Sequence, residues 1–358
     1  MVQINCPECN TKVSSEAQIC SNCGYPLPET LIPEKEPEIE HDVLKKWHGL
    51  GAEAIIPSCV TSIADRAFEG CRNLTSIIIP DSVISIGRGA FCDCSSLMSI
   101  SIPDSVTSIG GEAFHYCSNL ESIILSSNIK SIEIRTFEGC SNLTSIIIPD
   151  RVLKIGAYVF ADCSSLTSIT IPNKVLSIGE KVFAGCTSLI SITIPDSVLS
   201  IGTGIFTGCQ ELTEVIVSEN NRRFAGQNGI LYNKDKTMLL SCPNEKNILP
   251  AIPDSVITIG KEAFLGCKNL EEITLPDNLT AVGESAFSSC ECLTTVDIPD
   301  GLTKIGYCAF CGCKSLITIA IPESVTTVGG KVFSGCPVES DMKKLCKERG
   351  IDRTEIFW

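Results

Sequence analysis

One phenylalanine recurs every 23 residues along most of this chain, and this spacing restricts the possible folds more than any other feature. A cysteine follows each of these phenylalanines by three residues, so two columns share one period. The step from Phe206 to Phe264 is 58 residues, which is one repeat plus 35 further residues. Units of this length bury their hydrophobic faces by stacking on one another, so the period predicts a solenoid. The columns are Phe68, Phe91, Phe114, Phe137, Phe160, Phe183, Phe206, Phe264, Phe287, Phe310 and Phe333, and Cys71, Cys94, Cys117, Cys140, Cys163, Cys186, Cys209, Cys267, Cys290, Cys313 and Cys336.

Within one unit, the apolar residues are spaced for a coil of short strands. Leu74, Ile77 and Ile79 point to one side of a strand, and Pro80 ends that strand because proline cannot donate to a ladder. An Asp-Ser turn and a second apolar pair follow, and Gly87 is predicted to bend the backbone at a positive φ. Stacked coils of this kind place equivalent residues about 4.8 Å apart.

These residues resemble the BspA-like branch of the leucine-rich-repeat family, whose unit reads approximately L-x-x-I-x-I-P-x-S-V-x-x-I-G-x-x-A-F-x-x-C. The match covers about four-fifths of the chain, and the departures keep the coil pattern. Ser126 and Ser218 replace the proline, and Thr136 and Ile205 replace the alanine. The resemblance implies a β-rich, right-handed stack of coils.

The sequence predicts four segments. Residues 1–28 form a zinc ribbon, and residues 29–42 form an acidic linker rich in proline and glutamate. Residues 43–338 form the solenoid, with an N-terminal cap predicted as a helical turn within residues 41–50 and an insertion at about residues 218–252. Two β-rich runs around Asn233–Lys236 predict a hairpin in that insertion. Residues 339–358 form a C-terminal cap, with a helix starting near Ser340 and stopping at Gly350.

The N-terminal segment carries the clearest chemical motif. Cys6-Pro-Glu-Cys9 and Cys20-Ser-Asn-Cys23 are two C-x-x-C pairs separated by ten residues, which is typical of a tetrahedral Zn²⁺ site. Residues 4–27 resemble the short zinc-ribbon family. Four sulfur ligands leave no open coordination position, so one structural Zn²⁺ per chain is predicted, ligated by Cys6, Cys9, Cys20 and Cys23. Four unlinked cysteines are the alternative, and recruitment of a partner by the ribbon stays open.

The repeated cysteines allow three interpretations: a disulfide ladder, a metal array or simple packing. Buried thiols act as small hydrophobic groups, and a spacing of about 4.8 Å is slightly long for disulfides, so packing is favoured. A second metal or redox site is a lesser alternative where Cys308, Cys311 and Cys313 lie near Cys290 and Cys292.

Charge and composition restrict the partners. The formal net charge is −14, which disfavours binding to nucleic acid and to anionic membranes. No apolar run is long enough for a membrane span, and the N-terminus lacks the features of a signal peptide, so a cytoplasmic location is predicted, with the cell surface as the alternative.

An acidic residue follows most of the repeat prolines. These residues are interpreted either as turn formers or as an acidic ridge that attracts a basic partner: Asp81, Asp104, Asp150, Asp196, Asp254, Asp277, Asp300 and Glu323.

No arrangement of residues typical of an enzyme is recognisable. The chain has three histidines, His41, His48 and His115, and His115 is interpreted as a surface or cap residue. Neither a P-loop nor a dinucleotide-binding motif occurs. The outward positions of the first strand are mostly serine, threonine and isoleucine, which suits contacts with proteins or glycans. The sequence therefore predicts a non-enzymatic protein–protein interaction scaffold of undetermined partner and oligomeric state, with a cell-surface adhesin for host proteins or glycans as the alternative and a nucleic-acid regulator disfavoured.

Overall fold

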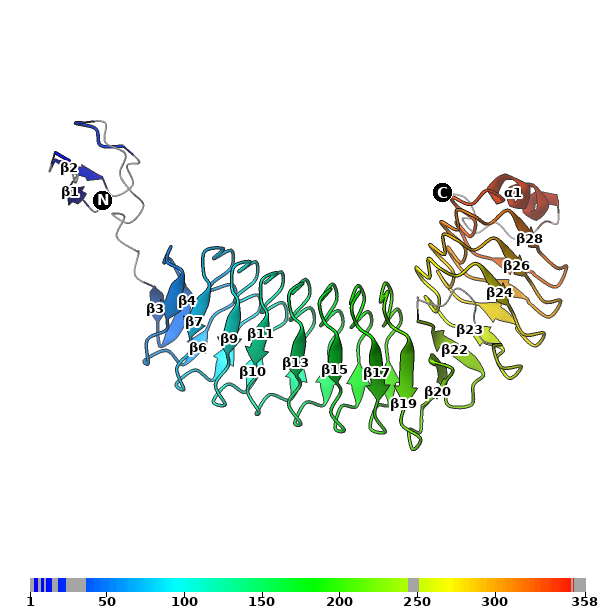
Figure 1. Cartoon of the computed structure of the whole chain (residues 1–358), viewed down its shortest axis with the longest axis horizontal. Helices are drawn as coiled ribbons and strands as arrows, with labels where there is room; N and C mark the ends of the chain where they lie inside the picture. Colours follow the sequence, from blue (N-terminus) through cyan, green and yellow to red (C-terminus); the bar gives the residue numbers. More distant parts are fainter. Residues whose placement is uncertain are drawn as a thin grey trace.

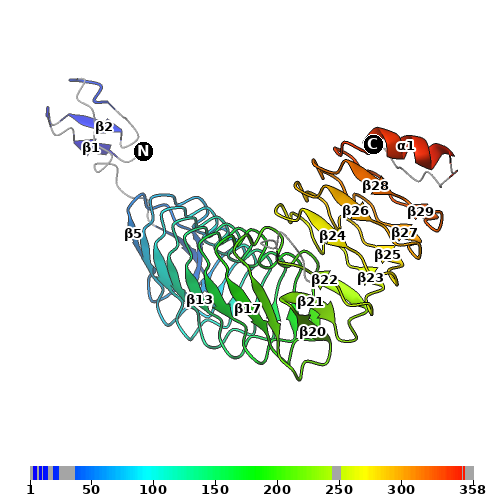
Figure 2. The ribbon, with the colours of Figure 1, turned by 45° about the vertical axis from the view of Figure 1, so that its right-hand side comes forward.

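The predicted solenoid is confirmed. The computed structural model describes residues 3–5, 8–9, 11–14, 19–23, 37–243, 251–348 and 350. The repeats form a β-solenoid of about 12 turns. Figure 1 shows the turns stacked side by side along a curved path, and Figure 2 shows the same stack from an angle turned by 45°.

Each turn contributes two short strands, and each strand pairs in parallel with its equivalent in a neighbouring turn. The register equals the repeat, because Ser99 pairs with Ser122 and Ile132 pairs with Ile155. Equivalent side chains therefore lie above one another, which is the arrangement that the 23-residue period predicts. Within the described residues the strands form two rows on different sides of the solenoid.

The first-strand row contains β5 (Glu53–Ile55), β7 (Ser76–Ile78), β9 (Ser99–Ser101), β11 (Ser122–Ile124), β13 (Ser145–Ile147), β15 (Ser168–Thr170), β17 (Ser191–Ile194), β19 (Glu214–Val217), β24 (Glu272–Thr274), β26 (Thr295–Asp297) and β28 (Thr318–Ala320). The second-strand row contains β3 (Glu38–Glu40), β4 (Val43–Lys46), β6 (Ser62–Ile63), β8 (Ser85–Ile86), β10 (Ser108–Ile109), β12 (Ser131–Ile132), β14 (Lys154–Ile155), β16 (Ser177–Ile178), β18 (Ser200–Ile201), β20 (Phe224–Gln227), β21 (Ile230–Asn233), β22 (Met238–Ser241), β23 (Thr258–Ile259), β25 (Ala281–Val282), β27 (Lys304–Ile305) and β29 (Thr327–Val328).

The phenylalanine column forms the centre of the core. Its rings stack on one another with centroids 4.8 to 6.0 Å apart, from Phe68 to Phe206 and again from Phe264 to Phe333. The backbone supports the same contact, because the Phe68 N–H donates to the Ala90 carbonyl at 2.7 Å and the pattern repeats in later turns. Each turn therefore offers its neighbour the same ring and backbone contacts.

The cysteine column packs in the core as reduced thiols, as predicted. The Cys94 Sγ lies 3.1 Å from the carbonyl oxygen of Phe68, which also accepts the Cys71 N–H of its own turn. Nine such thiol–carbonyl hydrogen bonds join successive turns, and the structure contains no disulfide among the described cysteines. Burial raises the pKa of the Cys209 thiol to about 12, so that thiol keeps its proton and can donate. A thiol suits this position because it fills apolar space and satisfies a carbonyl of the neighbouring turn.

Gly87 differs from the prediction. Its φ is not in the left-handed region, and a Cβ at this residue would lie 2.4 Å from the backbone nitrogen of Asp65 in the preceding turn. The repeat therefore needs glycine here because two backbones approach closely, not because the chain bends at a positive φ.

The insertion is a three-stranded sheet. The predicted hairpin around Asn233–Lys236 is confirmed as β21 and β22, which pair antiparallel. The sequence did not predict β20, which pairs antiparallel with β21 through a turn at Asn228 and Gly229. Strand β22 then pairs in parallel with β23, so the insertion begins the second-strand sheet of the later turns, and the phenylalanine stack is interrupted between Phe206 and Phe264.

The N-terminal cap is a β-hairpin and not the predicted helical turn. Strands β3 and β4 pair antiparallel through His41 and Asp42, both at positive φ, and β4 pairs in parallel with β6. Strand β3 lies in the stretch predicted as linker. Trp47 then stacks on Phe68 with centroids 5.3 Å apart, so it closes the phenylalanine column at this end. Extending the ladder satisfies the backbone of the first turn, which a helical turn cannot do.

The other end of the solenoid carries the predicted helix. Helix α1 (Glu339–Glu348) begins next to the Ser340 predicted to start it, and it buries Met342 and Cys346 against the last turn. Gly350 has a positive φ of 62°, as expected of a residue that ends a helix. The helix covers the apolar end of the stack (Figure 1).

Replacing Phe160 with alanine tests the importance of the phenylalanine column. Phe160 is fully buried and stacks on Phe137 and Phe183 at 5.7 and 5.8 Å. We expect Phe160→Ala to lower the free energy of unfolding by about 3–5 kcal/mol, since the cavity cannot close between two fixed turns. Chemical denaturation followed by circular dichroism measures the change. Ile147→Ala, at an 84% exposed position, is the matched control; an equal effect of both substitutions would contradict the prediction.

Candidate metal centre and binding surfaces

Three of the four predicted zinc ligands meet in the N-terminal segment. Strands β1 (Gln3–Asn5) and β2 (Lys12–Ser14) pair antiparallel, and the turn between them contains Cys9. The Sγ atoms of Cys9, Cys20 and Cys23 all lie within 4.8 Å of one another, with Cys9 and Cys20 at 3.6 Å. Cys6, the fourth predicted ligand, lies outside the described residues.

The geometry fits a Zn²⁺ ion. A tetrahedral zinc with Zn–S bonds of about 2.3 Å holds its sulfur ligands about 3.8 Å apart, close to the observed separation. Hydrogen bonds between Cys9 and the side chains of Thr11 and Asn22 lower the pKa of the Cys9 thiol to about 5, which favours the thiolate that binds metal. Bound zinc would crosslink the two ends of the ribbon and supply much of its folding energy, because such a short segment has little core.

The second proposed cluster does not assemble. Among the described residues, the three ribbon cysteines are the group whose ligand atoms converge on a common point. Cys313 belongs to the core column and lies 3.1 Å from the Phe287 carbonyl, whereas Cys308 and Cys311 are only partly buried. Cys292 is exposed. The inward direction of Cys313 therefore separates it from the other two thiols.

The outward side of the first-strand row between β5 and β19, here called the first-strand face, is nearly uncharged and partly apolar. Its strands contain only two charged residues, Glu53 and Glu214, one at each end. Alternate residues point outward, so a row of serines lies beside a row of β-branched residues. The isoleucines with large exposed fractions are Ile55 (67%), Ile78 (61%), Ile124 (67%), Ile147 (84%) and Ile216 (42%). The later strands β24 and β26 are more acidic, with Glu272 and Asp297 exposed.

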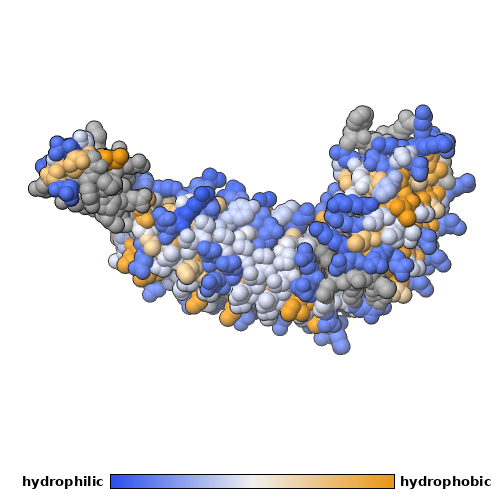
Figure 3. All heavy atoms as spheres, turned by 45° about the horizontal axis from the view of Figure 1, so that its top comes forward, coloured by the Kyte–Doolittle hydropathy of each residue, from blue (hydrophilic) through white to orange (hydrophobic). Residues whose placement is uncertain are grey.

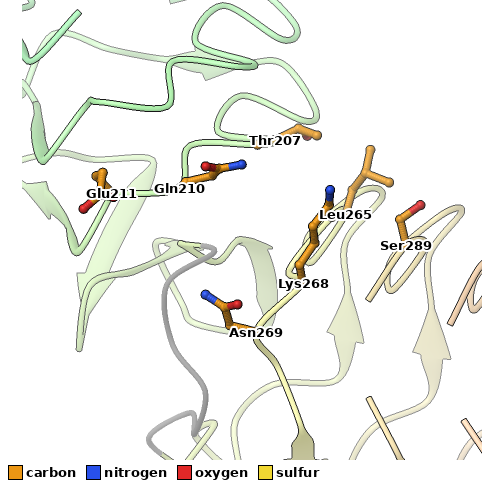
Figure 4. Close-up of a pocket in the computed structure, with 9 residues that line it drawn as sticks. Thr207, Gln210, Glu211, Leu265, Lys268, Asn269 and Ser289 are labelled. Atoms are coloured by element: carbon orange, nitrogen blue, oxygen red, sulfur yellow. The ribbon is translucent and has the colours of Figure 1, made fainter. Parts of the chain in front are cut away.

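A cavity of about 620 Å³ lies where the insertion interrupts the stack. Figure 4 shows Thr207, Gln210 and Glu211 on the turn before the insertion and Lys268 and Asn269 on the turn after it. The two sides are also joined by an ion pair between Lys181 and Glu262, whose Nζ and Oε1 atoms are 3.6 Å apart. The described lining residues offer hydrogen-bond donors and acceptors. They include no cysteine or histidine, so the cavity suits binding better than catalysis.

The structure also assembles a group of polar side chains that the sequence analysis did not recognise. His115 was interpreted as a surface or cap residue, but its side chain is only 16% exposed. Its Nδ1 lies 3.8 Å from the Cys92 Sγ, and its Nε2 lies 3.5 Å from the Glu138 Oε2. Each of the three directly follows a column phenylalanine, so their spacing of 23 residues is the signal that could have found them. The other histidines lie near the N-terminal hairpin, where His48 is 3.6 Å from Glu38.

The acidic residues after the repeat prolines are all exposed. Asp104 accepts a hydrogen bond from the Ser127 N–H of the next turn at 2.7 Å, and that bond lowers the pKa of its carboxyl group. Turn chemistry therefore accounts for Asp104. The hypothesis of a ridge for a basic partner stays open for the column as a whole.

Comparison with known families matches the two parts of the chain separately. Residues 38–165, 130–228 and 235–343 match the family described as BspA type leucine rich repeat region, and residues 5–27 match the zinc-ribbon domain. No significant match was found among proteins of curated function.

Several solved structures resemble the solenoid. A leucine-rich cell surface protein from Faecalibacterium prausnitzii is 31% identical, with a TM-score of 0.70 over 85% of this chain and 91% of that one. The pneumococcal vaccine antigen PcpA is 27% identical, with a TM-score of 0.66 over 82% and 72% of the two chains. A leucine-rich repeat protein from Bacteroides ovatus is also 27% identical, with a TM-score of 0.51 over 88% and 86%. Within the part of the chain described here, no helix has the length and apolar character needed to cross a bilayer.

Zinc content tests the metal centre. We expect the purified full chain to contain about one zinc per molecule, because four thiolates at this spacing form a closed tetrahedral site. Replacing both Cys9 and Cys20 with serine should remove that ion, as measured by elemental analysis of dialysed protein. Cys59→Ser, at an exposed thiol of the solenoid, is the control and should leave the content unchanged. Equal zinc in the double variant and in the unmodified chain would contradict the prediction.

Proposed function

Because the chain belongs to the BspA-type leucine-rich-repeat family, whose members are typically non-catalytic binding proteins, we propose that it is a protein–protein interaction scaffold. The observation that carries the proposal is the first-strand face. It combines exposed isoleucines with small hydroxyl side chains over eight successive strands, from β5 to β19. Contiguous exposed apolar surface of this kind marks interaction sites on soluble proteins.

Two physical features favour a protein as the partner. The backbone of the first-strand face is held by pairs of parallel strands, so it is ordered before binding and loses little entropy on contact. Hydroxyl groups between the isoleucines can pair with backbone groups of the partner, and the near absence of charge lowers the desolvation cost. Figure 3 shows that hydrophobic residues on the face it presents are scattered among polar ones, so the solenoid is not apolar on all sides.

The role of the zinc ribbon follows from its chemistry. Four thiolates leave no coordination position for a substrate, so the ribbon stabilises a small module and does not catalyse a reaction. Its ligands Cys6, Cys9, Cys20 and Cys23 are proposed as a structural site. The ribbon would provide a second contact surface, separate from the solenoid.

For location we propose the cytoplasm, because the described cysteines of the column form no disulfide and a reducing compartment keeps such thiols reduced. The second candidate function is a cell-surface adhesin for host proteins or glycans. The observation that favours it is the similarity to the Faecalibacterium cell surface protein. The two candidates share the binding role and differ in the compartment.

Charge introduced into the first-strand face tests the binding role. We expect Ile147→Lys to weaken partner binding roughly tenfold or more, because a buried lysine would lack a counter-charge in the interface. The partner is first isolated with the unmodified chain from native cells, and its Kd is then measured with purified components. Leu153→Lys is the matched control, since Leu153 is 42% exposed on the second-strand side of the same turn. An equal loss for both variants, or none for Ile147→Lys, would refute the assignment of this face.

Labelling of intact cells separates the two locations. Cys59 and Cys292 are exposed thiols of the solenoid, so a membrane-impermeant maleimide reaches them only where the solenoid faces the medium. For a cytoplasmic protein we expect labelling of both residues after lysis and none before it, as read by mass spectrometry of their peptides. Labelling in intact cells would instead support the adhesin.

A further inference from the structure

The residue directly after each column phenylalanine forms a third column, and four neighbouring turns place metal-ligating side chains in it. These residues are Glu69, Cys92, His115 and Glu138. In the next two turns the same position is alanine, Ala161 and Ala184, so the group is confined to one part of the solenoid. The ladder holds their backbones: the Gly70 N–H donates to the Cys92 carbonyl and the Asp93 N–H to the His115 carbonyl, at 2.8 and 2.7 Å.

The distance between Cys92 and His115 matches two ligands of one ion. The Cys92 Sγ and the His115 Nδ1 are 3.8 Å apart. A tetrahedral zinc with a Zn–S bond of about 2.3 Å and a Zn–N bond of about 2.0 Å holds these two atoms about 3.5 Å apart. An ion can therefore occupy the position between them after a shift of a few tenths of an ångström.

Glu138 occupies the position of the group that orients a metal-bound histidine. Metal-binding imidazoles commonly donate the N–H of their other nitrogen to a carboxylate. The His115 Nε2 faces the Glu138 Oε2 at 3.5 Å, and both atoms are buried without a hydrogen-bond partner. Glu138 is only 9% exposed, and Arg135 lies 3.5 Å from the same Oε2 atom. A proton held on Nε2 would leave Nδ1 free to bind a metal, and the two atoms would then satisfy each other.

Glu69 belongs to the same column, one turn before Cys92, but it is not a third ligand. Among the described residues, its carboxylate does not form a group of three converging ligand atoms with Cys92 and His115. Its present partner is Arg66 at 3.7 Å, an exposed pair that contributes little stability. The other nearby carboxylates are held by arginines, Asp93 by Arg72 and Glu112 by Arg88.

We propose that Cys92 and His115 form a second metal site, on the solenoid, that binds a divalent cation of the zinc class, with water in the remaining coordination positions and Glu138 as the residue that orients His115. Binding releases the thiol proton of Cys92 to solvent, so the ion meets a thiolate and a neutral imidazole. The site is independent of the N-terminal ribbon and of the proposed binding face.

The same three residues could instead suggest a cysteine nucleophile with a histidine base. Two observations disfavour that reading. Burial and the carboxylates of Glu69, Asp93 and Glu112 raise the pKa of the Cys92 thiol, whereas a nucleophile needs it lowered. Cys92 does not line the cavity at Thr207 and Lys268, nor the two cavities near Trp47 and Ile178.

Cobalt binding tests the proposal in the full chain, with Co²⁺ alone as the probe. The ribbon site is first removed by replacing Cys9 and Cys20 with serine. We expect that variant still to bind one Co²⁺ and to show the near-ultraviolet absorption of a cobalt–thiolate bond. Adding Cys92→Ser or His115→Gln should abolish the absorption, and Glu138→Gln should weaken Co²⁺ binding by about 10- to 100-fold. Cys292→Ser is the control and should leave the absorption unchanged.

A second measurement uses the unmodified chain, so it does not depend on the folding of any variant. Zn²⁺ at saturating concentration should slow alkylation of Cys92 at least tenfold and leave that of the exposed Cys59 unchanged, as read by peptide mass spectrometry. The proposal would be overturned if the ribbon variant showed no cobalt–thiolate absorption, or if Cys92 were alkylated equally with and without Zn²⁺. In that case Cys92 and His115 form only a hydrogen bond between thiol and imidazole. Either result is independent of whether the first-strand face binds a protein.

Discussion

The contact of each turn with its neighbour, in a register of 23 residues, is the constraint on which the rest of the structure depends. The backbone ladder, the stacked phenylalanine rings and the thiol–carbonyl hydrogen bonds all join equivalent positions of adjacent turns. A turn of different length would move every side chain out of its column, and the core would lose three kinds of contact together. This explains why the period is kept so strictly and why the one large departure must be a folded insertion. The ends obey the same rule, since Trp47 stacks on the first phenylalanine and Met342 packs on the last turn.

The insertion shows what happens when the constraint is relaxed. Strand β22 joins the insertion to the later turns by pairing with β23 in parallel, whereas the sheet of the earlier turns ends at β18. Among the described residues, no stacked ring joins Phe206 to Phe264, so the phenylalanine stack stops and starts again. The cavity beside Thr207 and Lys268 lies at this interruption. The second-strand ladder is interrupted at the same place, since one sheet ends at β18 and the next begins at β20.

The sequence predicted most of the fold because the fold is periodic. The strands, the buried phenylalanines and the packing role of the thiols all follow from one repeat, read eleven times. The predictions failed where the period gives no information. Residues 41–50 contain leucines and a tryptophan at helical spacing, yet they form a strand because an open ladder edge was available beside them. Gly87 was predicted from its own conformational freedom, whereas its role lies in the closeness of the preceding turn. Interactions between turns, not within one, decided both cases.

The same reasoning explains why a chemical group can be hidden in a solenoid sequence. Cys92, His115 and Glu138 are 23 residues apart, so no local motif connects them, and a search for short spacings such as C-x-x-C passes over them. In the folded chain each step of 23 residues brings two side chains into contact, as the distances from His115 to its two neighbours show. To find functional residues in this class of fold, one must therefore compare the residues at one repeat position over a few adjacent turns. A position whose residue varies from turn to turn, and which is cysteine, histidine and glutamate in three consecutive turns, is where a repeat protein can acquire a site without disturbing its core.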